Sequence, residues 1–109
     1  MLDLEKCKDN LGFLDKYFGV LSINYCKSDG LRDVDFIYKG GTETELISND
    51  YSICIHHNSL YEVAVLYSIC CYANEMCECS VGSSLMLDIY KRIINNSEIM
   101  CKVKECCKF

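Results

Sequence analysis

The fold is decided by residues 59–79, which read SLYEVAVLYSICCYANEMCEC. Ser59, followed three residues later by Glu62, is typical of a capping box at the start of a helix. At 100° per residue, Val65, Ile69, Tyr72 and Met76 form one apolar stripe, which Leu66, Cys70, Ala73 and Cys77 widen on its flank. The most polar strip that remains consists of Ala64, Ser68, Cys71, Glu75 and Glu78. An apolar arc this wide predicts a core helix that touches more than one neighbouring element.

A first helix is expected over residues 3–18, where apolar residues recur at alternating steps of three and four. This seam consists of Leu4, Cys7, Leu11, Leu14 and Phe18. Asp3 can cap the helix, and Gly19 can end it in the left-handed conformation. The seam predicts a helix that lies on a sheet, and the alternative is a two-helix seam across a homodimer.

Residues 20–57 change to an alternation of period two, which is typical of strands with one buried face. Turn residues separate the alternating runs, so we expect four short antiparallel strands joined as a meander. A three-residue loop at 40–42 would place Phe36 opposite Leu46 and Tyr38 opposite Thr44, with a glycine in the left-handed position. That register puts the aromatic side chains on the inner face.

Two further segments follow the central helix. A helix capped by Ser84 is expected to end at Asn95, with Lys91 and Arg92 in its last turn. The tail at 97–109 fits either a strand or a helix, and we favour a helix capped by Ser97. The sequence thus predicts one α+β domain over residues 1–109. Its N-terminal helix is followed by a four-stranded antiparallel meander and by two to three helices packed on one face of the sheet.

Composition limits the classes of function. The net charge is −5 in 109 residues, which argues against direct nucleic-acid binding and favours a basic protein partner. No apolar run is long enough to span a membrane, and charges near the N-terminus argue against a signal peptide. Ten cysteines meet the compositional flag for a disulfide scaffold. Because several of them occupy helix-core positions, we expect reduced thiols in a cytoplasmic compartment.

The cysteines and histidines offer two weak chemical sites. No two cysteines have the two intervening residues of a common zinc motif, although Cys77, Cys79, Cys101 and Cys106 could meet if the tail folds back. Cys54 and His56 share a strand face and are the best local thiol–imidazole pair, while His57 points the other way. With no cation or orienting group visible near Cys54, a packed cysteine beside an exposed histidine is the expectation we prefer.

The outer face of the predicted sheet is acidic. Its candidate partner-binding residues are Asp33, Asp35, Glu43, Glu45 and Asp50. Such a run is usually a solvated surface, but it can also dock a basic protein. No phosphate-binding loop, dinucleotide fingerprint, HExxH motif or calcium loop is present.

These features predict a small, acidic, non-enzymatic protein that binds and blocks a partner and needs no cofactor. The abundance of Ile, Lys, Tyr and Asn and the scarcity of Pro, Ala and Arg indicate an AT-rich genome. Size and charge alone suggest an antagonist from a phage or mobile element that acts on a nucleic-acid-handling host protein, in the style of anti-CRISPR and immunity proteins. The alternatives are a zinc-binding or thiol redox module and, more remotely, an enzyme that uses Cys54 and His56.

Overall fold

The computed structural model describes residues 2–17, 35–47, 52–76 and 83–109, and they form an α+β structure. The elements are α1 (Leu4–Asn10), a 3-10 turn η1 (Gly12–Leu14), strands β1 (Asp35–Tyr38), β2 (Glu43–Ile47) and β3 (Ser52–His56), and helices α3 (Leu60–Met76), α4 (Ser83–Ile94) and α5 (Ser97–Cys106). Among the described residues, none of the helices combines the length and apolar character that crossing a bilayer requires.

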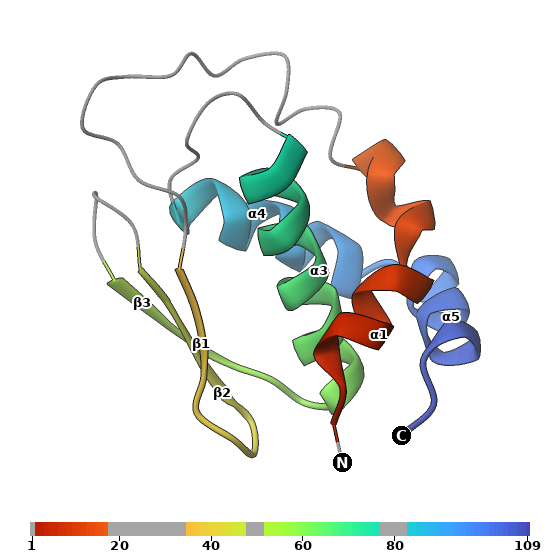
Figure 1. Cartoon of the computed structure of the whole chain (residues 1–109), viewed down its shortest axis with the longest axis horizontal. Coiled ribbons are helices and arrows are strands. Elements are labelled where there is room, and N and C mark those ends of the chain that lie inside the picture. Colours follow the sequence, from red (N-terminus) through yellow and green to blue (C-terminus); the bar gives the residue numbers. More distant parts are fainter. Residues whose placement is uncertain (1, 18–34, 48–51, 77–82) are drawn as a thin grey trace.

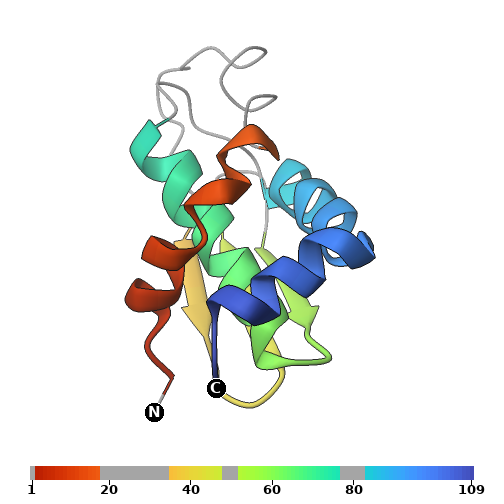
Figure 2. The ribbon, with the colours of Figure 1, turned by 90° about the vertical axis from the view of Figure 1, so that its right-hand side faces the viewer.

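The elements are stacked in layers, with α3 in the middle (Figure 1). The sheet lies on one side of α3, and α1 and α5 lie on the other, while α4 packs beside α3 and reaches β3. Seen from the helical side, α1 and α5 stand in front of α3, and the sheet lies behind them (Figure 2). All the described helices therefore lie on one face of the sheet, as predicted, but α1 packs on α3 rather than directly on the sheet.

Helix α3 is buried on nearly every side because it is enclosed by these layers. Four consecutive residues, Val63 to Leu66, are fully buried, and so is Ile69. The predicted polar strip is wrong in this respect, since Ala64 and Ser68 are buried too. The Ser68 hydroxyl donates to the Ala64 carbonyl oxygen at 2.8 Å, so its burial leaves no polar group unpaired.

The sheet has the order β1-β2-β3 and is antiparallel throughout. Phe36 lies opposite Leu46 and Tyr38 opposite Thr44, which confirms the predicted register. Gly40 and Gly41 have φ angles of +87° and +60°, a region that suits glycine. The meander is thus confirmed for three strands, whereas the fourth predicted strand, at 21–26, lies outside the described residues.

The predicted first helix is interrupted. Asp3 caps α1 as expected, by accepting a hydrogen bond from the Lys6 amide. The helix ends at Asn10, however, and the chain tightens into η1, where the Leu14 amide donates to the Leu11 carbonyl oxygen. Gly12 is a poor helix former and sits at this break, which accounts for the change.

The apolar seam of this first segment is used within the chain. Cys7, Leu11 and Leu14 are all buried in the same core as α3. These three residues of the seam therefore pack within the chain and are not exposed to a second copy.

The C-terminal tail is a helix, as we favoured. Helix α5 begins at Ser97, but its cap is Asn96, whose side-chain oxygen accepts hydrogen bonds from the Glu98 and Ile99 amides. The prediction that Ser97 is the cap is therefore wrong by one residue. Helix α4 begins at Ser83, one residue before the predicted cap Ser84, and carries Lys91 and Arg92 in its last turn.

Candidate functional site

The sheet face opposite the helices is the first candidate site. Side chains alternate along each strand, so one set points at α3 and the other points away from the helical layers. The outward set consists of Asp35, Ile37, Lys39, Glu43, Glu45, Ile47, Ser52, Cys54 and His56. We call these nine residues the outer face. Ile37 is 44% exposed and is one of two large hydrophobic residues that the described part of the chain leaves open to solvent.

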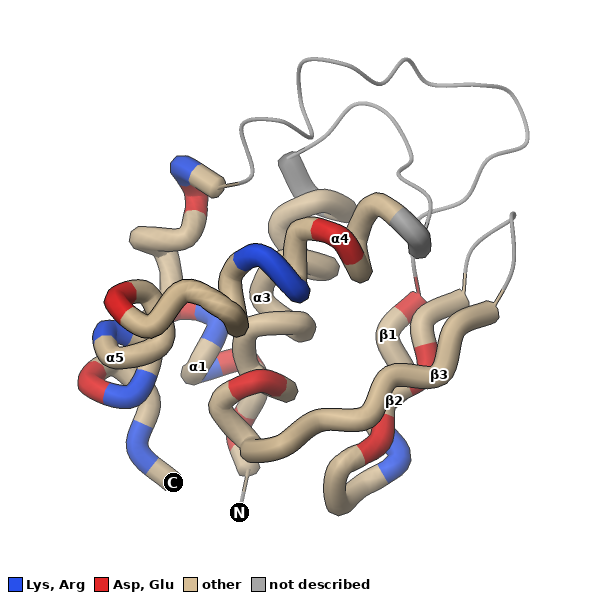
Figure 3. Tube along the Cα trace, turned by 180° about the vertical axis from the view of Figure 1, so that it is seen from behind, with Lys and Arg blue, Asp and Glu red and all other residues tan. Residues whose placement is uncertain are grey.

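The outer face carries an excess of negative charge. Three of the five predicted partner-binding residues belong to it, namely Asp35, Glu43 and Glu45. The other two, Asp33 and Asp50, lie outside the described residues. Lys39 is the only Lys or Arg in the described strands and their hairpin. Figure 3 shows the contrast with α1, α4 and α5, each of which carries both signs of charge.

Lys39 and the two glutamates form an ion-pair network on this face. The Lys39 Nζ lies 2.9 Å from a Glu45 carboxylate oxygen and 3.8 Å from one of Glu43. The hydrogen bond from Lys39, and then one from Ser52 at 2.9 Å, lower the pKa of Glu45. A hydrogen bond from Cys54 is the largest cause of the lowered pKa of Glu43, and Lys39 adds to it. Both carboxylates are therefore held ionised at neutral pH.

The Cys54 thiol is held as a donor on this face. Its Sγ donates to a Glu43 carboxylate oxygen at 2.8 Å, and this hydrogen bond raises the pKa of Cys54. A nucleophilic cysteine needs the opposite shift, because the thiolate is the reactive form. His56 does share the face with Cys54, as predicted, and both side chains are exposed. The expectation that Cys54 would be packed is thus wrong.

The predicted cysteine cluster is not brought together by the part of the chain that the structure describes. Cys77 and Cys79 lie outside that part. Cys101 and Cys106 are both in α5, five residues and therefore about 140° apart around the helix, and only Cys106 is partly buried. Within the described ranges, no group of three His, Cys, Asp or Glu residues has the arrangement to hold a metal ion.

A buried polar network behind the sheet was not predicted. His57 is 3% exposed, and its two ring nitrogens each lie 2.9 Å from a hydroxyl: Nδ1 from that of Tyr90 and Nε2 from that of Thr44. The Tyr90 hydroxyl donates in turn to a Glu62 carboxylate oxygen at 3.1 Å. The network joins β2, the end of β3, α3 and α4.

The donors and acceptors of this network fix one form of the imidazole. The single Tyr90 proton is given to Glu62, so the Tyr90 oxygen accepts from an Nδ1–H of His57. Nε2 is then an acceptor for the Thr44 hydroxyl. Burial lowers the pKa of His57, although Glu62 acts in the opposite direction, so the ring is neutral at pH 7. We assign a structural role to this network, because all four groups are buried and mutually satisfied.

The strand alternation correctly predicted that His57 points to the face opposite Cys54 and His56, which is the inner face. Its partners could not be found in that way, since they come from three other elements. Glu62 was interpreted only as half of a capping box.

No protein-family model, curated protein sequence or solved structure matches this chain. The described geometry is therefore the basis of the functional inference that follows.

Proposed function

We propose that the protein is a non-enzymatic binding module whose outer face docks a basic surface of a protein partner and blocks it. The observation that carries this proposal is the charge of that face: three carboxylates against one lysine, on a side of the sheet that the described helices leave uncovered. Complementary charge steers association and selects among partners.

The outer face also has the mixed character of a docking surface. Ile37 stands 44% exposed on β1, with Glu45 opposite it on β2. An apolar side chain surrounded by charged groups can fill a small pocket on a partner, while the carboxylates accept hydrogen bonds from Arg or Lys. A partner lysine or arginine would compete with Lys39 for Glu43 and Glu45, and surface ion pairs of this kind are weak enough to be exchanged.

Other features favour binding over chemistry. The Cys54 pKa is raised and the His57 imidazole is enclosed, so neither presents an activated group to a substrate. As a more specific form of the proposal, the partner is a nucleic-acid-handling protein of a host cell, blocked by a phage or mobile-element antagonist in the cytoplasm. Nucleic-acid-handling proteins present basic surfaces, and an acidic docking face would bind to such a surface.

The test compares two variants with the same net charge. In the face variant, Asp35→Asn, Glu43→Gln and Glu45→Gln neutralise the outer face. In the control variant, Asp9→Asn, Asp15→Asn and Asp88→Asn neutralise three exposed aspartates of the helical side. Each protein is immobilised and used for affinity capture from a lysate of its native cells at physiological salt, followed by quantitative mass spectrometry.

We expect the wild type and the control variant to capture the same basic protein and the face variant to lose it. Equal capture by all three proteins would refute the outer face as the binding site. Equal loss from both variants would show that net charge, rather than this face, determines association, and would refute the proposal as well.

A further inference from the structure

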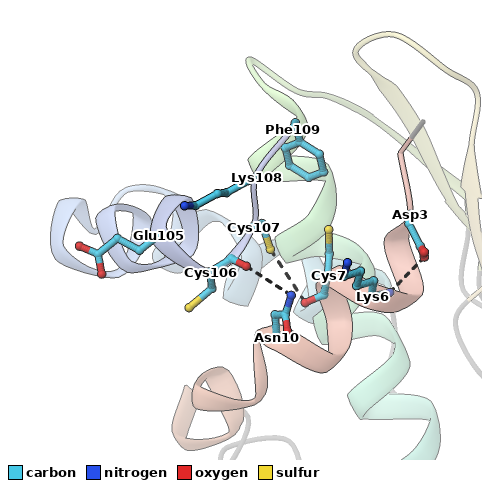
Figure 4. Close-up of a pocket in the computed structure, with 9 residues that line it drawn as sticks. All are labelled: Asp3, Lys6, Cys7, Asn10, Glu105, Cys106, Cys107, Lys108 and Phe109. Atoms are coloured by element: carbon cyan, nitrogen blue, oxygen red, sulfur yellow. Dashed lines mark hydrogen bonds between the residues drawn. The ribbon is translucent and has the colours of Figure 1, made fainter.

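The two ends of the described chain meet at a cavity that contains a pair of thiols. The cavity measures about 420 Å³ and lies between α1 and the C-terminal segment (Figure 4). Its lining residues are Asp3, Lys6, Cys7, Asn10, Glu105, Cys106, Cys107, Lys108 and Phe109. Three of the seven cysteines in the described part of the chain are among them. This site is separate from the outer face and from the proposed docking.

Cys7 and Cys107 are in direct contact. The Cys107 Sγ lies 3.9 Å from the Cys7 carbonyl oxygen, to which it donates. Burial raises the pKa of Cys107 to about 12, and a hydrogen bond with the Cys7 side chain is the next cause. The contact therefore joins two cysteines that are 100 residues apart in the sequence.

The neighbouring contacts hold the two segments together. The Asn10 side-chain amide donates to the Cys106 carbonyl oxygen at 3.3 Å, which fixes the peptide immediately before Cys107 against α1. Cys107 itself has an extended backbone at the C-terminal end of α5. A disulfide would require Cys107 to move toward Cys7, and Cys107 lies just past Cys106, the last residue of α5.

The Cys106 thiol is the obvious competitor, and its geometry is different. In Figure 4 the Cys106 sulfur points away from Cys7, while the Cys107 sulfur points toward it. Both members of the Cys7–Cys107 pair are buried, at 7% and 2% exposure, yet both line the cavity. Their place in the cavity lining distinguishes them from Cys70, a fully buried thiol that lines none of the described cavities.

We propose that Cys7 and Cys107 are a redox-active pair, which a low-molecular-weight disulfide entering this cavity converts reversibly to a disulfide bond. One protein thiolate attacks the small disulfide, forms a mixed disulfide and releases one small thiol. The second protein thiol then attacks the sulfur of the first and releases the other small thiol. The protein sulfurs lose two electrons, the small disulfide gains them, and the two protons end on the released thiols.

The bond would tie α1 to the C-terminal segment and close a loop between two residues that are 100 positions apart. Cross-linking so long a loop restricts the unfolded chain strongly, so the oxidised protein should melt about 10 °C or more above the reduced one. Because the thiolate is the reactive form, the raised pKa makes the reaction slow at neutral pH.

The full chain is incubated with 2-hydroxyethyl disulfide at pH 8.5. This probe is uncharged, so Lys6 and Asp3 at the cavity do not bias its entry. We expect tandem mass spectrometry to locate a Cys7–Cys107 bond, with an intact mass 2 Da lower, and dithiothreitol to reverse both the bond and the rise in melting temperature. Cys106→Ser should still form the bond, whereas Cys7→Ser and Cys107→Ser should not.

Two outcomes would overturn the proposal, and both can be observed with the wild-type chain. One is that Cys7 and Cys107 stay reduced while the exposed Cys54 and Cys101 form mixed disulfides. The other is that Cys7 becomes joined to Cys106 or to any other cysteine. Neither outcome depends on capture of a partner, so this test and that of the outer face fail independently.

Discussion

Replacing Thr44 by valine tests the buried network most directly. The substitution keeps the shape of the side chain and removes only the hydroxyl that donates to His57 Nε2 at 2.9 Å. Thr44 is fully buried and His57 is 3% exposed, so water cannot replace the lost hydroxyl. A buried acceptor left without a partner costs about 1–3 kcal/mol. We expect the free energy of unfolding to fall by that amount.

The network offers His57 no other arrangement without a further loss. If the imidazole proton moved to Nε2, Nδ1 would need a donor, and the nearest is the Tyr90 hydroxyl. That hydroxyl has one proton and already gives it to Glu62. Any tautomer change would therefore only transfer the unpaired group from His57 to Glu62.

Urea denaturation followed by circular dichroism measures the effect. Thr42→Val is the matched control, because Thr42 is exposed in the hairpin, and it should change the free energy of unfolding by less than about 0.5 kcal/mol. In a His57→Phe background, Thr44→Val should cost at least about 1 kcal/mol less, since its partner is already gone. An equal cost in both backgrounds would show that Thr44 and His57 are not coupled and would refute the assignment.

Two further predictions concern pH and the hairpin. Burial lowers the pKa of His57, so below pH about 6.5 the unfolded chain binds a proton that the folded chain does not, and stability falls by at most about 1.4 kcal/mol per pH unit. Urea titrations at pH 7.5 and 5.5 measure how the free energy of unfolding changes with pH. The His56→Gln variant should keep the predicted change, and the His57→Gln variant should show a smaller one. An unchanged pH dependence in His57→Gln would contradict the assignment of this effect to His57. Gly41→Ala should lower the free energy of unfolding by about 1 kcal/mol because its φ is positive, although nothing lies within 4 Å of the new Cβ. Gly12 lies in equally open space but has no positive φ, so Gly12→Ala should raise the free energy of unfolding by about 0.5–1 kcal/mol. Melting curves in which Gly41→Ala and Gly12→Ala change the stability in the same direction would refute the conformational explanation.

The sequence predicted best where one local pattern determines the structure. The period of two on both sides of Gly40-Gly41 was sufficient to obtain the register of β1 and β2, because a two-residue loop would have placed Phe36 opposite Glu45. The 3.6-residue period likewise located the start of α3 and both ends of α4 to within one or two residues, whereas for the tail at 97–109 it left a strand open beside the favoured helix. Both patterns depend only on which side chains share a face.

The errors have a common physical cause, which is that tertiary contacts decide the outcome. Ser68 was assigned to a polar strip, but a serine can be buried at no loss when its hydroxyl donates to the preceding turn. Gly12 was expected inside a continuous helix, and the chain instead turns there to pack Leu14 into the core. Glu62, at the start of α3, accepts its hydrogen bond from Tyr90 on α4, a partner 28 residues away.

The buried network and the outer face are linked through β2. Glu43 and Glu45 point outward from this strand. Thr44, which lies between them, and Leu46, which follows Glu45, point inward and are fully buried. A slip of one residue in the register would exchange the two sets, burying two carboxylates and exposing the partner of His57. The hydrogen bonds of His57 to Thr44 and Tyr90 therefore oppose such a slip, because they form in only one register. The same residues that stabilise the interior thus keep the acidic side chains on the surface where docking is proposed.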